Sequence, residues 1–309
     1  MAAIYRVDKS FDKSLLAGAS CAFGVFDGVH TGHQYLLACA CETAEGSKGK
    51  SIALTFDSDP DEMFRPDSLK KLLGNEDRLK MLSKSGVDAV VVLPFTKEFA
   101  AEPPMEFLKT TFGEHAPSYL HVGRDFHFGA RAAGEVEDLQ EWAHNSGTRI
   151  KAHHLVSADG LPISATRIRK LLMTGDIKQA NKLLGYPYTL HESVHPGRGE
   201  GRNLGFRTAN LIVPANKRVL EEGVYASYAI VDDVMYRAAV SVGISPVFEA
   251  TSTATCEVHI LDFNEELYNH DIKVQFIERL RPMIDFPTTE ELVSTVMQNI
   301  DWVRKNLPL

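Results

Sequence analysis

The feature that most constrains the fold of this chain is a change in its hydrophobic pattern near residue 187. Before that point short apolar runs alternate with helical patterns, whereas from Tyr188 onward apolar runs follow one another without helices between them. Alternating strands and helices are typical of a parallel sheet with crossover connections, and successive strands are typical of an antiparallel sheet or barrel. We therefore expect two domains of different architecture, residues 1–186 and residues 187–309.

The first half contains five apolar runs that have the length and composition of strands, namely SCAFGVF, SIALTF, DAVVVLPF, SYLHVG and RIKAHHL. Helical patterns lie between them, near residues 32–45, 75–85, 104–112 and 135–146. This alternation predicts a doubly wound α/β domain with a parallel sheet covered on both faces. Two more short helices are expected within residues 163–185, with Gly175 closing the first and Asp176 capping the second.

The second half contains six apolar runs separated by turn residues, namely YTLHESVH, TANLIVP, GVYASYAIV, YRAAVSVG, TCEVHILDF and KVQFIERL. These runs predict an antiparallel β-barrel. In the tail, residues 288–306, apolar side chains recur at helical spacing at Leu292, Val296, Ile300 and Val303. We therefore expect one C-terminal helix packed on the barrel.

Composition narrows the class of protein. With 309 residues, 44% of them hydrophobic and 24% charged, the chain is typical of a globular protein with two cores. Its net charge of −8 disfavours a nucleic-acid partner, because such proteins need clustered basic residues. No apolar run has the length of a signal peptide or a membrane span, so we expect a cytoplasmic protein without a membrane partner. The four cysteines lack C-x-x-C spacing, and we expect them to be reduced and mostly buried.

The segment GVFDGVHTGH, residues 24–33, lies where the first predicted strand ends and a helix begins. Strand ends of this kind border the ligand crevice of an α/β sheet, and helix N-termini attract phosphate. Glycines would let the backbone approach a triphosphate, and His30 and His33 would donate hydrogen bonds to the same oxyanions from one helical face. Candidate nucleotide-binding residues here are Gly24, Phe26, Asp27, Gly28 and Gly32.

Two other interpretations of this segment are open. A glycine-rich turn with two surface histidines would have the same composition, although the combination of residues makes that coincidence improbable. A zinc site at His30 and His33 would need a third ligand, and neither H-E-x-x-H nor a nearby cysteine cluster is present.

The segment resembles the G-x-F-D-G-x-H-x-G-H signature of nucleotidyltransferases, and the chain resembles the bifunctional prokaryotic riboflavin kinase and FAD synthetase family. HVGRDFHFG, residues 121–129, and ISATRIR, residues 163–169, are similar to two further motifs of that family, in the same order. The resemblance implies that Asp125 and Ser164 help to bind nucleotide, and that Thr166 and Arg169 close on the triphosphate. A guanidinium at Arg169 also suits the negative charge that grows on a pyrophosphate leaving group.

In the second half, HPGRGEGRNLGFRTANL, residues 195–211, resembles the riboflavin kinase segment with a glycine-rich ATP loop and a P-T-A-N signature. The resemblance implies nucleotide contacts from Gly197, Gly199, Gly201 and Arg202. Thr208 and Asn210 supply neutral oxygens for Mg²⁺, a hard cation that prefers such ligands. Glu257 aligns with the catalytic glutamate of the family, which would accept the proton of the riboflavin 5′-hydroxyl, although periodicity alone favours an outward-facing strand carboxylate with no such role.

The chain departs from the family patterns at several positions. Ala165 replaces a motif serine, and Asp59 replaces a histidine in FDSDP, where a carboxylate facing the site would repel phosphate. In the second half, Arg207 replaces the signature proline and Glu200 replaces a loop arginine. A further stretch has its asparagine, arginine and threonine replaced by Ser241, Ser245 and Val247. These changes put the activity of the kinase half in question, but not its barrel fold.

The resemblance implies a nucleotidyltransferase domain followed by a riboflavin kinase-like barrel with a C-terminal helix. The first would transfer AMP from ATP to FMN, and the second would phosphorylate riboflavin, with ATP and Mg²⁺ as cofactors and FMN and riboflavin as substrates. One alternative is an FAD synthetase whose barrel only binds flavin. A second is a flavin-binding regulatory protein without catalysis, and the sequence does not determine the oligomeric state.

Overall fold

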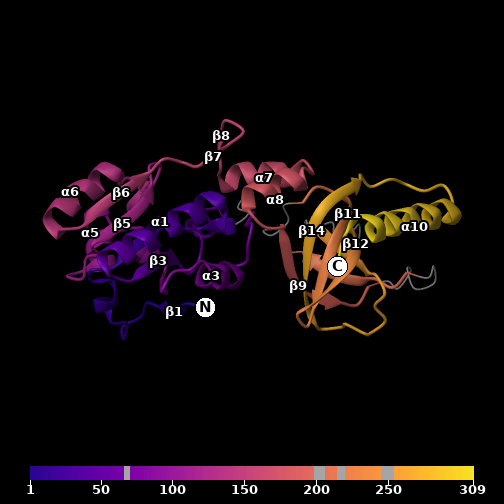
Figure 1. Ribbon diagram of the computed structural model, residues 1–309, viewed down its shortest axis with the longest axis horizontal. Helices are drawn as coiled ribbons and strands as arrows, with labels where there is room; N and C mark the ends of the chain where they lie inside the picture. Colours follow the sequence, from indigo (N-terminus) through magenta and orange to yellow (C-terminus); the bar gives the residue numbers. More distant parts are fainter. Residues whose placement is uncertain (66–69, 198–205, 214–219, 245–253) are drawn as a thin grey trace. The chain divides into compact units, whose positions relative to one another are not determined.

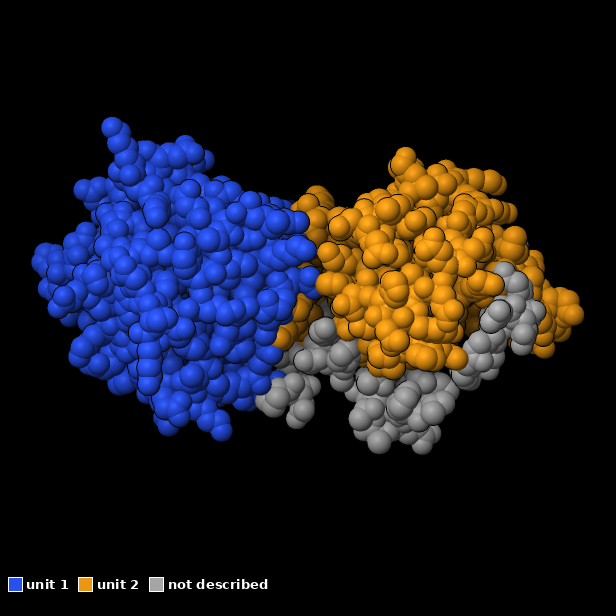
Figure 2. Space-filling view, turned by 90° about the horizontal axis from the view of Figure 1, so that it is seen from below, with its two compact units in different colours: residues 1–69, 75–164 blue, residues 70–74, 165–309 orange. Residues whose placement is uncertain are grey.

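The structure of the chain, a computed structural model, describes residues 1–65, 70–197, 206–213, 220–244 and 254–309 (Figure 1). Contacts divide the chain into two compact units, coloured separately in Figure 2. The first unit comprises residues 1–69 and 75–164, and the second comprises residues 70–74 and 165–309. The predicted boundary at 186/187 therefore differs from this division by two helices, α7 (Ala165–Met173) and α8 (Ile177–Leu184).

The first unit is built on a parallel six-stranded sheet in the order β1-β4-β3-β2-β5-β6. The five predicted strands are present, and the parallel α/β fold is confirmed. The strands are β1 (Ala3–Arg6), β2 (Ser20–Phe23), β3 (Ser51–Phe56), β4 (Ala89–Leu93), β5 (Tyr119–Gly123) and β6 (Arg149–His153).

The sequence analysis missed β1. All four of its residues are exposed, and it pairs only with β4 at the edge of the sheet. An edge strand with exposed side chains has no buried face, so it leaves neither an apolar run nor an alternating pattern in the sequence.

Helices connect these strands. The α-helices are α1 (Thr31–Ser47), α2 (Pro60–Phe64), α3 (Asn75–Ser83), α4 (Lys97–Ala100), α5 (Pro104–Phe112) and α6 (Val136–Ser146). Short 3₁₀ turns are η1 (Lys13–Leu16), η2 (Asp27–Val29) and η3 (Ala130–Ala132). A small hairpin of β7 (Ser157–Ala158) and β8 (Leu161–Pro162) precedes α7.

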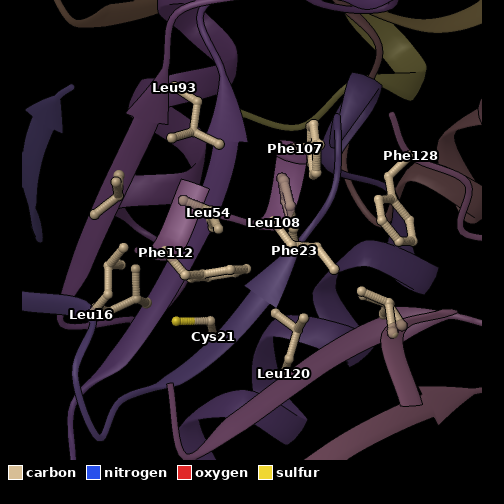
Figure 3. Packing of buried hydrophobic residues seen from close by; sticks show 14 of the residues in the cluster. Leu16, Cys21, Phe23, Leu54, Leu93, Phe107, Leu108, Phe112, Leu120 and Phe128 are labelled. Atoms are coloured by element: carbon tan, nitrogen blue, oxygen red, sulfur yellow. The ribbon is translucent and has the colours of Figure 1, made fainter. Parts of the chain in front are cut away.

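The core of the first unit lies on one face of the sheet, against α5 and α6 (Figure 3). Alternate residues of the central strands, such as Cys21, Phe23 and Leu54, pack there against Phe107 and Phe112 of α5. Successive side chains of a strand point to opposite faces, so the residues between them face the other side, where α1 packs on β2, β3 and β5. Every residue of β3 and β4 is buried, because both faces of the sheet are covered.

The second unit is a closed antiparallel barrel in the order β10-β13-β12-β11-β14-β9, as predicted. Its strands are β9 (Thr189–His195), β10 (Ala209–Val213), β11 (Gly223–Val231), β12 (Val234–Ile244), β13 (Ala254–Ile260) and β14 (Asp271–Arg281). The predicted C-terminal helix is α10 (Thr289–Asn306), which packs on β11 and β12 through the buried side chains of Ile300 and Val303.

Helices α7 and α8 are attached to this barrel rather than to the parallel sheet. The Asn181 side chain donates a hydrogen bond to the Phe276 carbonyl at 2.8 Å, and α8 packs on β14. The Glu221 amide donates to the Leu172 carbonyl at 3.0 Å. Asp176 caps α8 by accepting a hydrogen bond from the Gln179 amide at 3.2 Å, as predicted.

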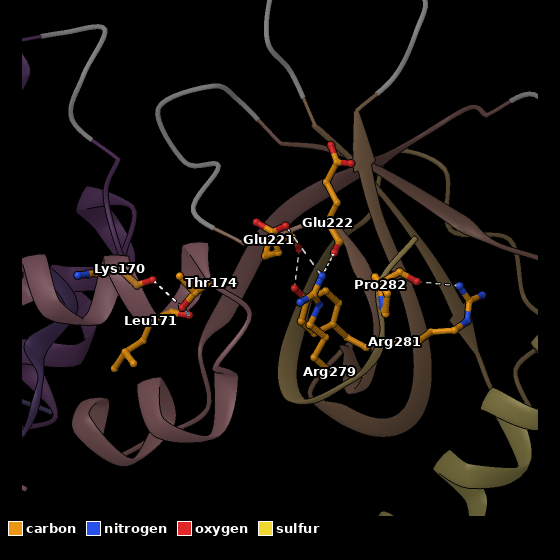
Figure 4. A network of polar contacts seen from close by, with 9 residues as sticks. Lys170, Leu171, Thr174, Glu221, Glu222, Arg279, Arg281 and Pro282 are labelled. Atoms are coloured by element: carbon orange, nitrogen blue, oxygen red, sulfur yellow. Dashed lines mark hydrogen bonds and ion pairs between the residues drawn. The ribbon is translucent and has the colours of Figure 1, made fainter. Parts of the chain in front are cut away.

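Gly175, which ends α7, also allows the Arg279 side chain of β14 to pack closely against the backbone. It adopts a φ of +78°, and a Cβ there would lie 2.6 Å from Nη1 of Arg279. The Arg279 guanidinium in turn donates to the Glu222 carbonyl at 2.5 Å, in the network that Figure 4 shows. A sequence reveals a helix-closing glycine, but not the arginine that fills the space beside it.

Cys21 and Cys256 are buried, Cys39 and Cys41 are half-buried, and all four are free thiols. Across the residues that the structure describes, no helix combines the length and apolar character that would be needed to cross a bilayer.

Candidate functional site

Two of the predicted motifs meet at the point where the strand order of the sheet reverses. After β2, the strands β3 and β4 are added on one side of it. The next strand, β5, then pairs with the other side of β2. In open α/β sheets ligands bind in the crevice outside the carboxyl ends of the strands at such a point. GVFDGVHTGH leaves the end of β2, and RDFHFG leaves the end of β5. The topology therefore brings both motifs to one edge.

The backbone of the loop after β2 is strained. Phe26 and Val29 have φ values of +58° and +34°, and Gly28 lies between them at +72°. A positive φ is rare for residues other than glycine, and for a β-branched residue such as Val29 it is an outlier. Strained backbone persists only where its surroundings impose it, and it concentrates at functional sites.

The glycines of this loop leave room for particular neighbours. A Cβ on Gly24 would lie 3.4 Å from the Phe26 ring, and one on Gly32 would lie 3.2 Å from the His30 ring. The prediction explained these glycines by close approach of a triphosphate. In the structure Gly28 also permits the turn, and Gly32 makes space for the imidazole.

His30 and His33 come together as a stacked pair, with ring centroids 3.6 Å apart and planes inclined by 17°. His30 is not inside α1 but caps it, and its Nδ1 accepts a hydrogen bond from the His33 amide at 3.3 Å. In a neutral His30 ring the proton is therefore on Nε2, which is the nitrogen that can donate a hydrogen bond. The Phe26 ring meets the His33 ring edge to face at 5.3 Å.

Burial, the adjacent His30 ring and the Arg78 guanidinium hold the pKa of His33 well below its usual value of 6.5. His33 is therefore neutral near pH 7. A neutral imidazole can donate a hydrogen bond to phosphate without competing for a proton.

Arg78, on α3, is a buried residue of this site that the sequence analysis missed. Its side chain is 2% exposed, and Nη1 donates to the Val25 carbonyl at 2.8 Å and to Thr55 Oγ1 at 2.7 Å. Nη2 donates to the Phe56 carbonyl at 2.7 Å. One guanidinium thus joins the loop after β2 to the end of β3. The sequence signal was an arginine four residues before Leu82, on the apolar face of the helix.

Burial lowers the pKa of Arg78, and the nearby carboxylates of Asp27, Asp59, Glu62 and Asp57 oppose that shift. An arginine nonetheless remains protonated in proteins. The positive charge of Arg78 therefore remains next to the loop that follows β2.

Arg78→Met is expected to lower the free energy of unfolding of the first unit by about 2–5 kcal/mol, because it leaves buried acceptors without a donor. The transfer of AMP to FMN that the resemblance implies should fall with it, since the loop that carries His30 loses an anchor. Urea denaturation and product assays measure both effects. Lys80→Met, which removes an exposed charge from the same helix, is the matched control. An equally stable Arg78→Met protein would contradict this role.

Asp59, which departs from the family histidine, has a structural role. It caps α2 by accepting a hydrogen bond from the Asp61 amide at 2.9 Å, while its own amide donates to Glu62 at 2.8 Å. The prediction assigned no phosphate contact to Asp59, and this capping box accounts for an acidic residue at the position.

The other predicted nucleotide residues are distributed over both units. Asp125 is exposed after β5, and Ser164 ends the first unit. Thr166 and Arg169 lie on α7, in the second unit, where Arg169 Nε donates to the Lys70 carbonyl at 2.6 Å.

In the barrel, three polar side chains form a row across neighbouring strands. Glu257 of β13 lies directly opposite Asn210 of β10 on one side and Ser241 of β12 on the other. Paired residues share a face, and Cys256 and Val258, which flank Glu257, are buried inside the barrel. Glu257 is therefore an exposed, outward-facing carboxylate beside the Asn210 amide.

Asn210 also lines a cavity of about 370 Å³, together with Thr208, Arg207 and Gly197. A Cβ on Gly197 would lie 2.1 Å from Asn210 Nδ2, so only glycine fits there. The predicted loop residues Gly199, Gly201 and Arg202 lie outside the described residues.

The donor set of this cavity fits a hard cation. Thr208 and Asn210 supply neutral oxygens, and the carboxylates of Glu265 and Glu266 line the same space. Within the described ranges, no group of three or more His, Cys, Asp or Glu side chains is arranged to hold a metal by itself. A cation held by Thr208 and Asn210 would therefore need further oxygens from its nucleotide and from water.

Comparisons with known proteins agree with the division into two halves. Residues 12–167 match the family model for FAD synthetase, and residues 184–307 match the model for riboflavin kinase. Among curated proteins, the bifunctional riboflavin kinase/FMN adenylyltransferase of Listeria monocytogenes is 32% identical over 276 residues, covering 88% of this chain and 87% of that protein. The protein of the same name from Pseudomonas fluorescens is 31% identical and covers 92% and 91%.

A crystal structure described as a macrolide-efflux protein of Streptococcus pneumoniae has the same fold over 99% of both chains, with a TM-score of 0.86 and 28% identity. The match spans both units of this chain.

Proposed function

This chain belongs to the bifunctional riboflavin kinase/FMN adenylyltransferase family, and from this premise we propose which residues carry out each of its reactions. It is an enzyme of FAD biosynthesis that converts riboflavin to FMN and FMN to FAD, with ATP as the donor in both steps. We assign adenylyl transfer to residues 1–186 and riboflavin phosphorylation to residues 187–309. The observation that carries the first assignment is the meeting of the two nucleotide motifs where the strand order reverses.

In adenylyl transfer, a phosphate oxygen of FMN attacks the α-phosphorus of ATP, and the bond to the β-phosphate breaks to release pyrophosphate. Negative charge grows on the leaving group, so donors held in fixed positions stabilise the transition state. His30 and His33 are such donors, because stacking and capping fix both rings before substrate binds. We assign the neutralisation of pyrophosphate to Arg169, with Asp125, Ser164 and Thr166 as nucleotide contacts.

In the kinase reaction, the 5′-hydroxyl of riboflavin attacks the γ-phosphorus of ATP and ADP leaves. Glu257 accepts the hydroxyl proton, since it is an exposed carboxylate next to Asn210. Mg²⁺, when bound, neutralises phosphate charge, and Thr208 and Asn210 would hold it.

We further propose that the enzyme works in the cytoplasm without nucleic-acid or membrane partners. Its net charge of −8 supports this proposal, because a polyanion would be repelled outside local basic sites.

Full-length protein incubated with ATP, Mg²⁺ and either riboflavin or FMN tests this function, with the flavins separated by chromatography. We expect riboflavin to give FMN and then FAD, and FMN to give FAD with one pyrophosphate per molecule. FAD from FMN but no FMN from riboflavin would indicate a barrel that only binds flavin. Binding of both flavins without any product would indicate the regulatory alternative.

A further inference from the structure

Arg207 lies at the entrance of β10, immediately before the two candidate Mg²⁺ ligands. It lines the same 370 Å³ cavity as Thr208 and Asn210. The family pattern has a proline at this position, so the motif assigns no function to an arginine here.

The backbone at Arg207 is held on both sides. The preceding residue, Phe206, is buried in the cluster under α10, and its ring meets the His259 ring edge to face at 6.0 Å. His259 Nδ1 donates a hydrogen bond to the Arg207 carbonyl at 2.8 Å. The Arg207 side chain therefore leaves from a fixed point at the cavity.

Most of the donor capacity of Arg207 remains available for a ligand. Among the described residues, its guanidinium makes one hydrogen bond, from Nη1 to the Asn264 carbonyl at 3.1 Å. A guanidinium has five N–H donors in a planar fork that matches phosphate oxygens. The bond to Asn264 leaves the other donors exposed to the cavity.

Among the described residues, one guanidinium and two carboxylates line this cavity, so an anionic ligand would bind at Arg207 itself rather than throughout the cavity. Glu265 and Glu266 line the cavity, and no ion pair joins either of them to Arg207 within the part of the chain that the structure describes. In the sequence, Glu200 and Ser245 occupy positions that are arginines in the family patterns. A site that binds ATP needs positive charge near the phosphates, and among the described residues that line this cavity Arg207 is the cation.

We propose that Arg207 binds the terminal phosphates of ATP in the kinase half, beside the cation held by Thr208 and Asn210. This inference rests on the proposed kinase function and adds a residue to it. Arg207 acts by binding nucleotide phosphate rather than by supporting the barrel.

The test uses the full chain with Arg207→Ala, Arg207→Lys and the control Lys305→Ala, which removes an exposed charge of the same sign from α10. In FMN formation, Arg207→Ala should raise the KM for ATP by about 10- to 100-fold, the range of a charged hydrogen bond. Inhibition by ADP should weaken equally, whereas inhibition by adenosine and the KM for riboflavin should not change. The KM of Arg207→Lys for ATP should lie between those of the wild type and Arg207→Ala, because lysine keeps the charge but lacks the planar fork of N–H donors.

If Arg207 had only a structural role, its replacement would weaken the binding of adenosine and riboflavin as well as that of ADP. That outcome would overturn the proposal. An unchanged KM for ATP would also overturn it. If the wild-type chain forms no FMN, the kinase assignment fails separately. Calorimetry with ADP then tests the role of Arg207. Wild-type protein should bind ADP at two sites, and Arg207→Ala should bind it at one. Equal stoichiometry and affinity in the two proteins would refute the inference.

Discussion

Replacing both His30 and His33 with alanine is expected to reduce FAD formation from FMN by about 10³-fold or more, and either change alone by about 10²-fold or more. One fixed oxyanion donor contributes about 10²–10³ to kcat in comparable sites. The rings are stacked 3.6 Å apart at the start of α1, so each orients the other. Because the lost contacts strengthen in the transition state, kcat and kcat/KM should fall together.

The matched control is His144→Ala, which removes an exposed imidazole from α6. FMN formation from riboflavin should be unchanged in every histidine variant, which would show that the barrel is folded, and an unchanged urea denaturation of the first unit would show the same for the parallel sheet. A double variant with wild-type FAD synthesis would refute the role of the pair.

The pH dependence of the wild-type enzyme gives a second measurement on the same pair. Burial, the adjacent His30 ring and the Arg78 guanidinium keep the pKa of His33 well below 6.5, so the ring stays neutral as the pH falls from 7 into the mildly acidic range. FAD formation should therefore not decrease between mildly acidic and neutral pH. A loss of rate centred on the ordinary histidine pKa would mean that an imidazolium is required instead.

Glu257→Gln is expected to reduce FMN formation from riboflavin by about 10²- to 10⁴-fold, the contribution of a general base. Glutamine keeps the size and shape of the side chain but cannot accept the hydroxyl proton. Because Glu257 lies opposite Asn210 and Ser241 on the outer face of the barrel, the change should leave the buried core intact. The KM for ATP should therefore change much less than kcat.

Product chromatography with riboflavin and with FMN measures both reactions of this variant. FAD formation from FMN should be unchanged. Glu290→Gln, on an exposed turn of α10, controls for the loss of one carboxylate from the second unit. A rate within a few-fold of wild type would mean that Glu257 is an ordinary strand carboxylate and that the base lies elsewhere.

The sequence by itself determined the class of each half of the protein. Strand and helix patterns predicted the parallel sheet, the barrel and the helix α10, because each records locally which side chains are buried. The sequence also predicted that Asp176 caps a helix and that Gly175 ends one, since both roles depend only on neighbouring backbone groups. The stacked pair of His30 and His33 could be expected for the same reason, because its members are three residues apart.

Only the tertiary structure decided the features that join distant segments. Arg78 reaches acceptors in the loop after β2 and at the end of β3, both far from it in sequence, and β1 has no buried face to mark it. Helices α7 and α8 have ordinary amphipathic patterns, which show that one face is buried but not against which partner. In the structure, Asn181 donates a hydrogen bond to the barrel, and Arg279 of the barrel packs beside the end of α7. Arg207 was predicted only as a departure from a motif, and the structure places it in the lining of a cavity with Thr208 and Asn210. The physical reason is common to all of these cases: periodicity reports that a side chain is buried or exposed, whereas its hydrogen-bond partner depends on how the chain returns to it.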